Sequence, residues 1–543
     1  MLTVRRPMAA AWLFFLLLAA CGGGAPPSGP APDSAVIVRG NGGEPGSLDP
    51  ALAEDIHAFN VLADLYEGLV ATDAAGRLVP AVASAWTISD DGRRYVFTLR
   101  EDARWSNGDP VEAGDFVRAF RRVADPETAS AYAFLFEPLE NFTAVAAGER
   151  PPEDLGVAAP DAHTLVVTLS RPAGQLLSVL AMPLAYPLHP RAARSVDAGD
   201  PGSFIGNGPF VLRSRDFMGP IRLARNPLYR ESASVAIDEV VYLPVVDEAA
   251  ELNMYRSGEL DITHTIPPEA LPALRETHAG ELRIAPMLAL YYLALDLGEP
   301  PLNNPALRAA LSLAIDRKRI VEVTGRGEAP AYALVPPGVH AYAGPSYDWR
   351  TLDDAARLER ARALYRDAGY GPDRPLALSY VYDAGGVHEQ IALAIVDMWE
   401  NALGVEVELD RREWQYFLET RDRRDEWDVM RFSWFGDYDD PLTFLDLFRA
   451  DSPQNLPAYS SEVYDRQLAE AVATVDAGER ARLFAQAEAT LLADHPLIPL
   501  YFYVSKHLVA PRVDGFEDNV LDRHPSRYLR LDPANGRTTP GGG

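Results

Sequence analysis

The sequence predicts a mixed α/β fold in a chain long enough for several domains. Residues 94–99 and 164–169 alternate apolar and polar side chains with the period of a half-buried strand. In the C-terminal half, an amphipathic helical segment at 391–403 is followed by Gly404 and by a strand-like segment at 405–409. Helices that alternate with strands along a chain are typical of the α/β class. The 543 residues correspond to roughly three domains of about 150 residues each.

The N-terminus has the layout of a secretory signal peptide covering residues 1–20. Arg5 and Arg6 precede an apolar run from Met8 to Ala20, which is shorter than the ~20 residues that comfortably span a bilayer. The run ends in Leu-Ala-Ala-Cys at positions 18–21, a sequence that resembles the bacterial lipobox. Such a signal is cleaved before its cysteine.

Cys21 is the only cysteine of the chain, and the resemblance to a lipobox implies that it becomes a lipid-bearing N-terminus. Two or more acyl chains give a stable membrane anchor. The alternative is a buried structural cysteine in a plain signal peptide. Residues 21–34 are rich in Gly, Pro and Ser, which predicts a flexible tether. We therefore expect an extracytoplasmic body, periplasmic or on the cell surface, anchored to an inner or outer membrane.

Further elements are predicted along the body from apolar periodicity and from capping residues. The expected strands and helices are a strand at 35–39, a helix that begins at Asn304-Pro305, helices at 352–368, 462–475 and 478–493, and a strand at 497–504. Residues 538–543 are expected to be a disordered tail.

Composition excludes several classes of protein. The formal net charge of -28 argues against a nucleic-acid partner, because phosphate binding needs a basic face. A hydrophobic content of 48% excludes bulk disorder. A single cysteine excludes an intramolecular disulfide and a Cys-rich zinc site.

Motifs for catalysis are absent from the sequence. It contains no G-x-S-x-G elbow, no P-loop and no G-x-G-x-x-G after a strand. The ten histidines are scattered, with no pair at short metal-ligand spacing. Asp437, Asp439 and Asp440 form an acidic cluster without the EF-hand pattern, and capping of a helix before Pro441 explains the last two. The sequence thus predicts no catalytic residue, no metal site and no cofactor.

Aromatic side chains crowd one window of the C-terminal half. The window contains Trp414, Tyr416, Phe417, Trp427, Phe432, Trp434, Phe435 and Tyr438. Arg421, Arg431 and Asp437 lie among them. Core packing explains most such windows, but charges interleaved with rings also suit the wall of a binding site.

Several motifs in a fixed order identify a family. They are Gly-Glu-Pro-Gly-Ser-Leu-Asp-Pro at 43–50, Leu-Tyr-Glu-Gly-Leu at 65–69, Tyr-Val-Phe-Thr-Leu-Arg at 95–100, Trp-Ser-Asn-Gly-Asp-Pro-Val at 105–111, Ala-Asp-Pro-Glu-Thr-Ala-Ser at 124–130, Gly-Asn-Gly-Pro-Phe at 206–210, Arg-Asn-Pro at 225–227 and Leu-Ser-Leu-Ala-Ile-Asp-Arg at 311–317. With them the chain resembles the oligopeptide-binding proteins of bacterial ABC importers, the extracytoplasmic solute-binding family 5, from about Val36 to about Val513.

The resemblance implies a fold of two lobes joined by a hinge, with an extra domain inserted in the first lobe. The implied parts are a discontinuous lobe one at 35–66, 200–264 and 505–537, the inserted domain at 67–199, and lobe two at 265–504. This organisation agrees with the number of domains expected from length.

The segment 431–438 matches the central ligand motif of the family. The resemblance implies that Asp437 pairs with the α-ammonium of a peptide and that Arg431 receives the carboxylate of a short peptide. Trp434 and Trp414 match tryptophans that line side-chain pockets. The alternatives are a helix-capping Asp437, a structural ion pair at Arg431, and core packing for the two tryptophans.

Further residues match pocket contacts of the family outside this segment. Tyr132, Arg421 and Tyr503 match side chains of the pocket, and Glu54 matches a glutamate near the peptide N-terminus. His388 matches a carboxylate partner for longer peptides, and the alternative is a surface histidine.

Two positions depart from the family pattern. Glu299 stands where members often carry a lysine that helps to bind a carboxylate, so the preferred peptide length can differ. Phe435 stands where some members carry a cysteine, and its ring is expected to narrow one side-chain pocket.

The sequence as a whole predicts a lipid-anchored, monomeric binding subunit of an ABC importer. It would capture short oligopeptides between two closing lobes and deliver them to permease subunits in the membrane. The alternatives are a receptor for murein peptides or for signalling peptides, a sensor that presents peptide to a signalling partner, and an extracytoplasmic peptidase.

Overall fold

A computed structural model describes residues 34–192, 201–339, 341–421, 423, 426–532 and 534 of the chain. The predicted signal peptide, Cys21, the tether up to residue 33 and the predicted tail lie outside the described residues. No helix among the described residues combines the length and the apolar character needed to cross a membrane.

The largest sheet has six strands and lies in the second half of the chain. Its strands are β11 (Leu282–Leu295), β12 (Ala329–Pro330), β13 (Ala377–Asp383), β14 (Glu406–Arg412), β15 (Val429–Phe435) and β16 (Leu497–Leu508). Their order is β12-β16-β11-β15-β13-β14. β13 pairs in parallel with both β14 and β15, whereas β11 pairs antiparallel with β15 and β16. The mixed α/β class predicted from the sequence is therefore confirmed.

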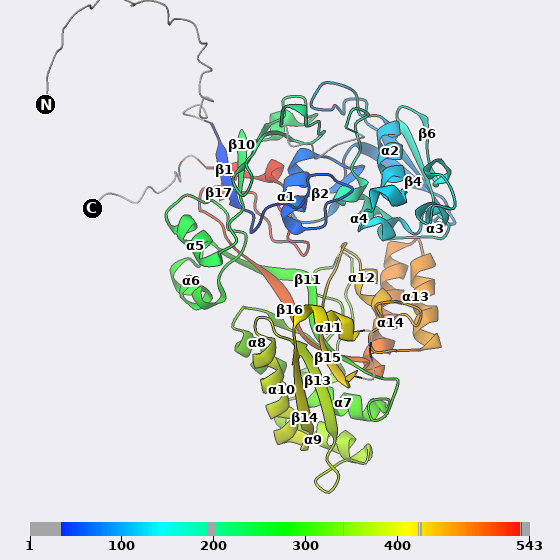
Figure 1. The fold of residues 1–543 in the computed structure, drawn as a ribbon, viewed down its shortest axis with the longest axis vertical. Coiled ribbons are helices and arrows are strands. Elements are labelled where there is room, and N and C mark those ends of the chain that lie inside the picture. Colours follow the sequence, from blue (N-terminus) through cyan, green and yellow to red (C-terminus); the bar gives the residue numbers. More distant parts are fainter. Residues whose placement is uncertain are drawn as a thin grey trace, which may run out of the picture. The chain divides into compact units, whose positions relative to one another are not determined.

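Helices cover both faces of this sheet, as Figure 1 shows for α8 and α10 on one side and for α13 and α14 on the other. Alternate residues of β11 contribute to two different cores, Leu293 to one and Leu290 to the other. A strand buried on both faces reads as a continuous apolar run, and 288–295 does. The helices of this region are α7 (Pro305–Ala314), α8 (Arg317–Thr324), α9 (Asp354–Asp367), α10 (His388–Leu403), α11 (Trp414–Arg421), α12 (Leu442–Leu445), α13 (Glu462–Ala473) and α14 (Ala477–Asp494).

A second sheet has the strand order β1-β10-β9-β8 and combines residues 36–40 with residues 210–243. β1 pairs in parallel with β10, and the other pairs are antiparallel. Its strands are β1 (Val36–Gly40), β8 (Phe210–Arg215), β9 (Ile221–Arg225) and β10 (Glu239–Leu243). α1 (Ile56–Leu65) packs in the core on one face, and α5 (Glu248–Arg256) and α6 (Leu271–Thr277) pack on the other.

A third, antiparallel sheet has the order β4-β5-β7-β6 and lies between β1 and β8 in the sequence. Its core is continuous with the core on the α1 face of the second sheet. The elements of this region are β2 (Val70–Thr72), β3 (Leu78–Pro80), β4 (Ala83–Ile88), β5 (Arg94–Leu99), α2 (Ala113–Ala124), α3 (Phe142–Ala146), β6 (Val157–Asp161), β7 (Thr164–Thr168) and α4 (Leu176–Leu180). Near the C-terminus, β17 (Val513–Asp514) pairs with β18 (Arg530–Leu531).

Local signals located most of the predicted elements correctly. Asn304 caps α7, because its side chain accepts a hydrogen bond from the backbone N–H of Ala306 at 3.0 Å. Gly404 follows α10 with a φ of 75°, a conformation that favours glycine. Three boundaries differ by three residues or more: α10 begins at His388 rather than at 391, β14 extends to Arg412 rather than to 409, and β16 extends to Leu508 rather than to 504. The extension of β16 is stabilised by pairing with β11, where Leu508 lies opposite Leu282.

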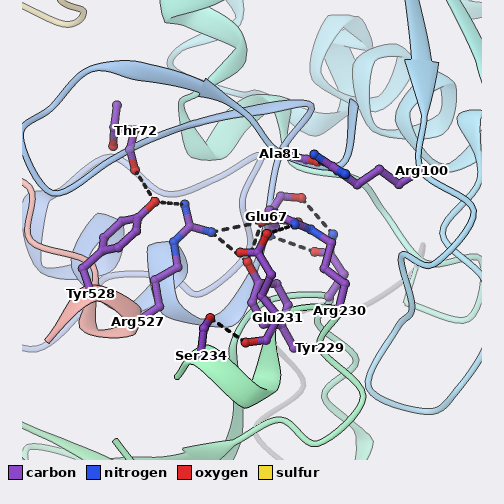
Figure 2. Close-up of polar contacts among 12 residues, drawn as sticks. Glu67, Thr72, Ala81, Arg100, Tyr229, Arg230, Glu231, Ser234, Arg527 and Tyr528 are labelled. Atoms are coloured by element: carbon purple, nitrogen blue, oxygen red, sulfur yellow. Dashed lines mark hydrogen bonds and ion pairs between the residues drawn. The ribbon is translucent and has the colours of Figure 1, made fainter. Parts of the chain in front are cut away.

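A buried ionic cluster joins three distant segments around the carboxylate of Glu67 (Figure 2). Glu67 Oε1 accepts from the hydroxyl of Tyr229 at 2.6 Å, from Arg230 Nη2 at 2.8 Å and from Arg527 Nη1 at 3.0 Å. The side chains of Glu67, Arg230 and Arg527 are 2%, 7% and 9% exposed. Burial alone would raise the pKa of Glu67, but the hydrogen bond from Arg230 and the two guanidinium charges outweigh it and lower the pKa.

Replacing Glu67 with glutamine is expected to lower the free energy of unfolding by about 3–5 kcal/mol, because two arginines would lose their buried partner. Glu231→Gln is the matched control, since Glu231 also pairs with Arg230 but is 52% exposed. We expect a change below about 1 kcal/mol for the control. Urea denaturation measures both, and equal effects would contradict the assigned role of Glu67.

Candidate functional site

Polar side chains gather where the parallel strands of the six-stranded sheet end. β13 ends at Asp383, and β15 ends at Phe435, just before Asp437. In the parallel register Val381 lies opposite Met430, so both strands end at one edge. Ligands of open α/β sheets bind outside the carboxyl ends of their strands. This edge is therefore the candidate binding site.

The first group of side chains surrounds the guanidinium of Arg431. Its Nη2 donates to His388 Nε2 at 2.5 Å, and its Nε lies 3.1 Å from Asp383 Oδ1. The second contact is an ion pair without a directed hydrogen bond, since neither atom has a hydrogen-bond partner among the described residues. His388 Nδ1 lies 3.2 Å from the hydroxyl of Tyr291. Because Nε2 accepts, the neutral imidazole carries its proton on Nδ1 and donates it to that hydroxyl.

His388 is neutral near pH 7. Burial lowers the pKa of His388 to about 4, and the charge of Arg431 acts in the same direction. The charge of Arg431 is balanced instead by Asp383, so the structural ion pair considered for Arg431 is present. A ligand carboxylate that reaches Arg431 would have to share the guanidinium with Asp383.

The second group surrounds Asp437, whose carboxylate receives no hydrogen bond from any donor among the described residues. Only its backbone N–H is bonded, to Thr443 Oγ1 at 3.2 Å. Burial raises the pKa of Asp437 to about 6, and the charge of Arg523 acts in the opposite direction. A desolvated carboxylate without a donor is costly in the free protein and suits a cationic ligand.

Tyr132 and Glu54 belong to the same electrostatic neighbourhood as Asp437. Burial raises the pKa of Tyr132, the charges of Asp437 and Glu54 raise it further, and Arg523 lowers it. Tyr132 also contacts Phe59, with ring centroids 5.9 Å apart. The structure thus brings the three predicted residues near one another, together with the half-buried Arg523 of the C-terminal segment.

The predicted aromatic residues differ in their surroundings. Trp414 is 49% exposed and stacks on Phe417 with ring centroids 5.9 Å apart. Trp434 is half-buried, and its Nε1 has no hydrogen-bond partner among the described residues. Tyr503 contacts Phe435, which is 52% exposed, at a centroid distance of 4.9 Å.

The remaining predicted residues lie at the margins of these groups. The hydroxyl of Tyr503 is 3.0 Å from Ser433 Oγ, across the sheet from β16 to β15. Arg421 is the last residue of α11. Burial raises the pKa of Tyr292, and the positive charge of Arg421 lowers it. Glu299 is exposed in the loop that follows β11.

Asp383 and Arg523 were not among the predicted site residues. Asp383 carried a usable signal, because it directly follows the apolar run of a strand at a sheet edge. Arg523 carried no such signal. The residues that act on its charge lie almost 90 to almost 400 positions earlier in the sequence, and only the path of the C-terminal segment brings them together. The binding roles of all these residues stay predictions.

Comparison with known proteins identifies the family. The family model described as "Bacterial extracellular solute-binding proteins, family 5 Middle" matches residues 77–455, and the chain belongs to this family. The periplasmic oligopeptide-binding protein OppA of Salmonella typhimurium is 37% identical over 492 residues, which cover 89% of this chain and 90% of that protein.

Solved structures agree with this assignment. The unliganded open form of the MppA periplasmic murein tripeptide binding protein matches with a TM-score of 0.86 at 33% identity, covering 92% of this chain and 98% of that one. Haemophilus influenzae OppA in complex with RPPGFSPFR matches with a TM-score of 0.71 at 33% identity, covering 92% and 99%. The expected two-lobe periplasmic-binding-protein fold is thereby confirmed.

Removing the charge of Asp437 is expected to stabilise the ligand-free protein. At about pH 8, Asp437→Asn should raise the free energy of unfolding by roughly 1–2 kcal/mol, because the raised pKa means that the folded state disfavours the carboxylate. At low pH the protonated carboxyl of Asp437 favours the folded wild type, and this contribution to its stability is lost as the pH rises through about 6. The difference should therefore vanish below about pH 4, where the carboxyl is protonated in both states.

Urea denaturation at several pH values measures this difference. An Asp437→Asn protein that is less stable than the wild type at pH 8 would show that the carboxylate makes a structural contact.

Proposed function

We propose that the protein is the substrate-binding subunit of an ABC importer and captures short oligopeptides between two lobes. Lobe one comprises residues 35–66, 200–264 and 505–537 with the insertion at 67–199, and lobe two comprises 265–504. The observation that carries the proposal is the half-buried carboxylate of Asp437, which receives no hydrogen bond from the described residues. The α-ammonium of a peptide is a cation that every peptide supplies.

A binding protein that accepts many peptides must recognise what peptides have in common. The backbone offers hydrogen bonds that give affinity without sequence preference. Water in roomy pockets mediates polar contacts to varied side chains. Closure of the lobes around the peptide then buries it and marks the loaded state for the permease. We also propose that the protein is a monomer and that it binds its ligand without catalysing a reaction.

Calorimetry with a free tripeptide and with its N-acetylated copy tests the role of Asp437. The wild type should bind the free peptide more than tenfold more tightly, because a buried charge-assisted hydrogen bond contributes about 1.5–3 kcal/mol. Asp437→Asn should remove most of this difference. Asp451→Asn, a change at an exposed aspartate, is the control and should keep it. Equal affinities of the wild type for both peptides would refute the assignment.

A parallel experiment addresses Arg431 and the peptide carboxylate. The wild type should bind a tripeptide more tightly than its C-terminal amide, and Arg431→Gln should reduce the ratio of the two affinities by about tenfold. Arg411→Gln, an exposed arginine of β14, should leave the ratio unchanged. If Arg431→Gln leaves the ratio unchanged while the protein stays folded, Arg431 is only the structural partner of Asp383.

Alternative ligands within the family are separated by their length and chemistry. Calorimetry with peptides of two to nine residues and with a murein tripeptide distinguishes a general oligopeptide receptor from a murein-peptide receptor, and a preference for one sequence would indicate a signalling peptide. Mass spectrometry after long incubation tests the peptidase alternative, because a binding protein leaves the peptide intact.

The proposal also places a lipid anchor at Cys21. It is supported by the Leu-Ala-Ala-Cys sequence at 18–21 and by the Gly/Pro-rich tether that follows. Several acyl chains would hold the protein at a membrane surface outside the cytoplasm, near the permease. The mass of the mature protein reports cleavage before Cys21 together with the added acyl groups.

A further inference from the structure

Histidines that are far apart in the sequence lie together where β16 approaches the C-terminal segment. The rings of His507 and His524 are 5.5 Å apart, and the rings of His57 and His264 are 5.3 Å apart. The two pairs are close enough for the charge of His507 to act on His264. The spacing of the histidines along the sequence did not indicate this gathering.

Three of the side chains in this region are arranged like the ligands of a metal ion. His507 Nε2 lies 2.8 Å and His524 Nε2 lies 3.1 Å from the same oxygen, Asp522 Oδ1. The candidate ligand atoms of the three residues all lie within 4.8 Å of one another. His507 and His524 are 6% and 9% exposed, and the side chain of Asp522 is 17% exposed. Ligands spaced in this way need only small shifts to reach a common ion at about 2.0–2.2 Å.

Hydrogen bonding orients His507 as metal-binding histidines are commonly oriented. Its Nδ1 lies 2.8 Å from the carbonyl oxygen of Thr263, so Nδ1–H donates to that carbonyl. This fixes the tautomer and directs the Nε2 lone pair at Asp522. A neutral Nε2 and a carboxylate oxygen at 2.8 Å both offer lone pairs, so a cation must lie between them. A proton on His507 fits this 2.8 Å separation, and a metal ion that replaces the proton needs the two atoms to move apart to about 3.3 Å for tetrahedral coordination.

His524 completes the set from the other side of the carboxylate. Its Nδ1 is buried and has no hydrogen-bond partner among the described residues. The ring is therefore held only by Asp522, by stacking on Phe516 at a centroid distance of 3.9 Å and by its edge contact with His507. Its Nε2 is free to exchange the contact with Asp522 for a metal ion.

We propose that His507, Asp522 and His524 bind a divalent transition-metal ion of the zinc class. Two imidazoles and one carboxylate form a ligand set that zinc and its neighbours accept, whereas calcium and magnesium prefer oxygen ligands. Water fills the fourth position. The positive charge of Arg39 disfavours a cation at this site, since its Nη1 donates to the carbonyl oxygen of His524 at 2.7 Å. The carboxylate of Asp522 supplies the compensating negative charge at the site.

The position of the site gives the ion a structural effect. His507 lies on β16 of the six-stranded sheet, and its partner Thr263 follows Ile262, which bridges to Arg39 of β1. The segment that carries Asp522 and His524 bonds to β11 through Val520, whose carbonyl accepts from Leu288 N at 2.9 Å. A bound ion would therefore cross-link β16 to the segment that carries Asp522 and His524, between the second sheet and the six-stranded sheet, and would stabilise the fold.

Equilibrium dialysis of the tag-free chain against zinc, followed by elemental analysis, tests the site. We expect one zinc per chain for the wild type and a loss of at least tenfold in affinity for His524→Gln. His278→Gln, a change at a histidine outside the cluster, is the control and should bind like the wild type. Cys21 is common to all three proteins, so any contribution from it cancels in the comparison.

Two further measurements keep the test independent of folding. Circular dichroism shows whether His524→Gln is folded, and the thermal midpoint shows whether zinc stabilises it. Zinc should raise the midpoint of the wild type and of His278→Gln but not that of folded His524→Gln, and magnesium should raise none of them. If His524→Gln does not fold, the ligand-field absorption of Co²⁺ bound to the wild type should show nitrogen ligands instead. Failure of the wild type to retain zinc, or equal retention by folded His524→Gln, would overturn the proposal and leave a proton between His507 and Asp522.

Discussion

The carboxylate of Glu67 is the constraint on which the arrangement of the first half of the molecule depends. It holds two arginines that lie 163 and 460 residues further along the chain. Displacing one of these segments would leave a buried charge without its partner, at a cost of about 3–5 kcal/mol. The cluster therefore fixes the path of the C-terminal segment against the early part of the chain.

That path determines the surroundings of both candidate sites. Arg527, which pairs with Glu67, lies four residues after Arg523 and three residues after His524. Arg523 is the cation that acts on Asp437, and His524 belongs to the proposed metal site. The charge that favours the ionised form of Asp437 is thus placed by an interaction outside the binding site. Burial of the Asp437 carboxylate lowers the stability of the folded state, and the stability of the surrounding structure compensates for this loss.

Sequence reasoning recovered the local elements and the family, but not the contacts between distant segments. The Asn304 cap, the glycine that ends α10 and the alternation at 94–99 are encoded by neighbouring residues, so they were found. The pairing of β16 with β11 as far as Leu508 depends on a partner strand more than 200 residues away. Arg523 and the His507–Asp522–His524 group were missed for the same reason. Only the folded chain brings such residues together.

The proposed role of Asp437 is to receive the α-ammonium of a bound peptide. A crystal structure of the protein with a tripeptide tests it most directly. The peptide nitrogen should lie about 2.7–2.9 Å from an oxygen of Asp437, with the peptide along the edge formed by β13 and β15. A peptide whose carboxylate lies beside Asp437, or whose ammonium group is bound elsewhere, would contradict it.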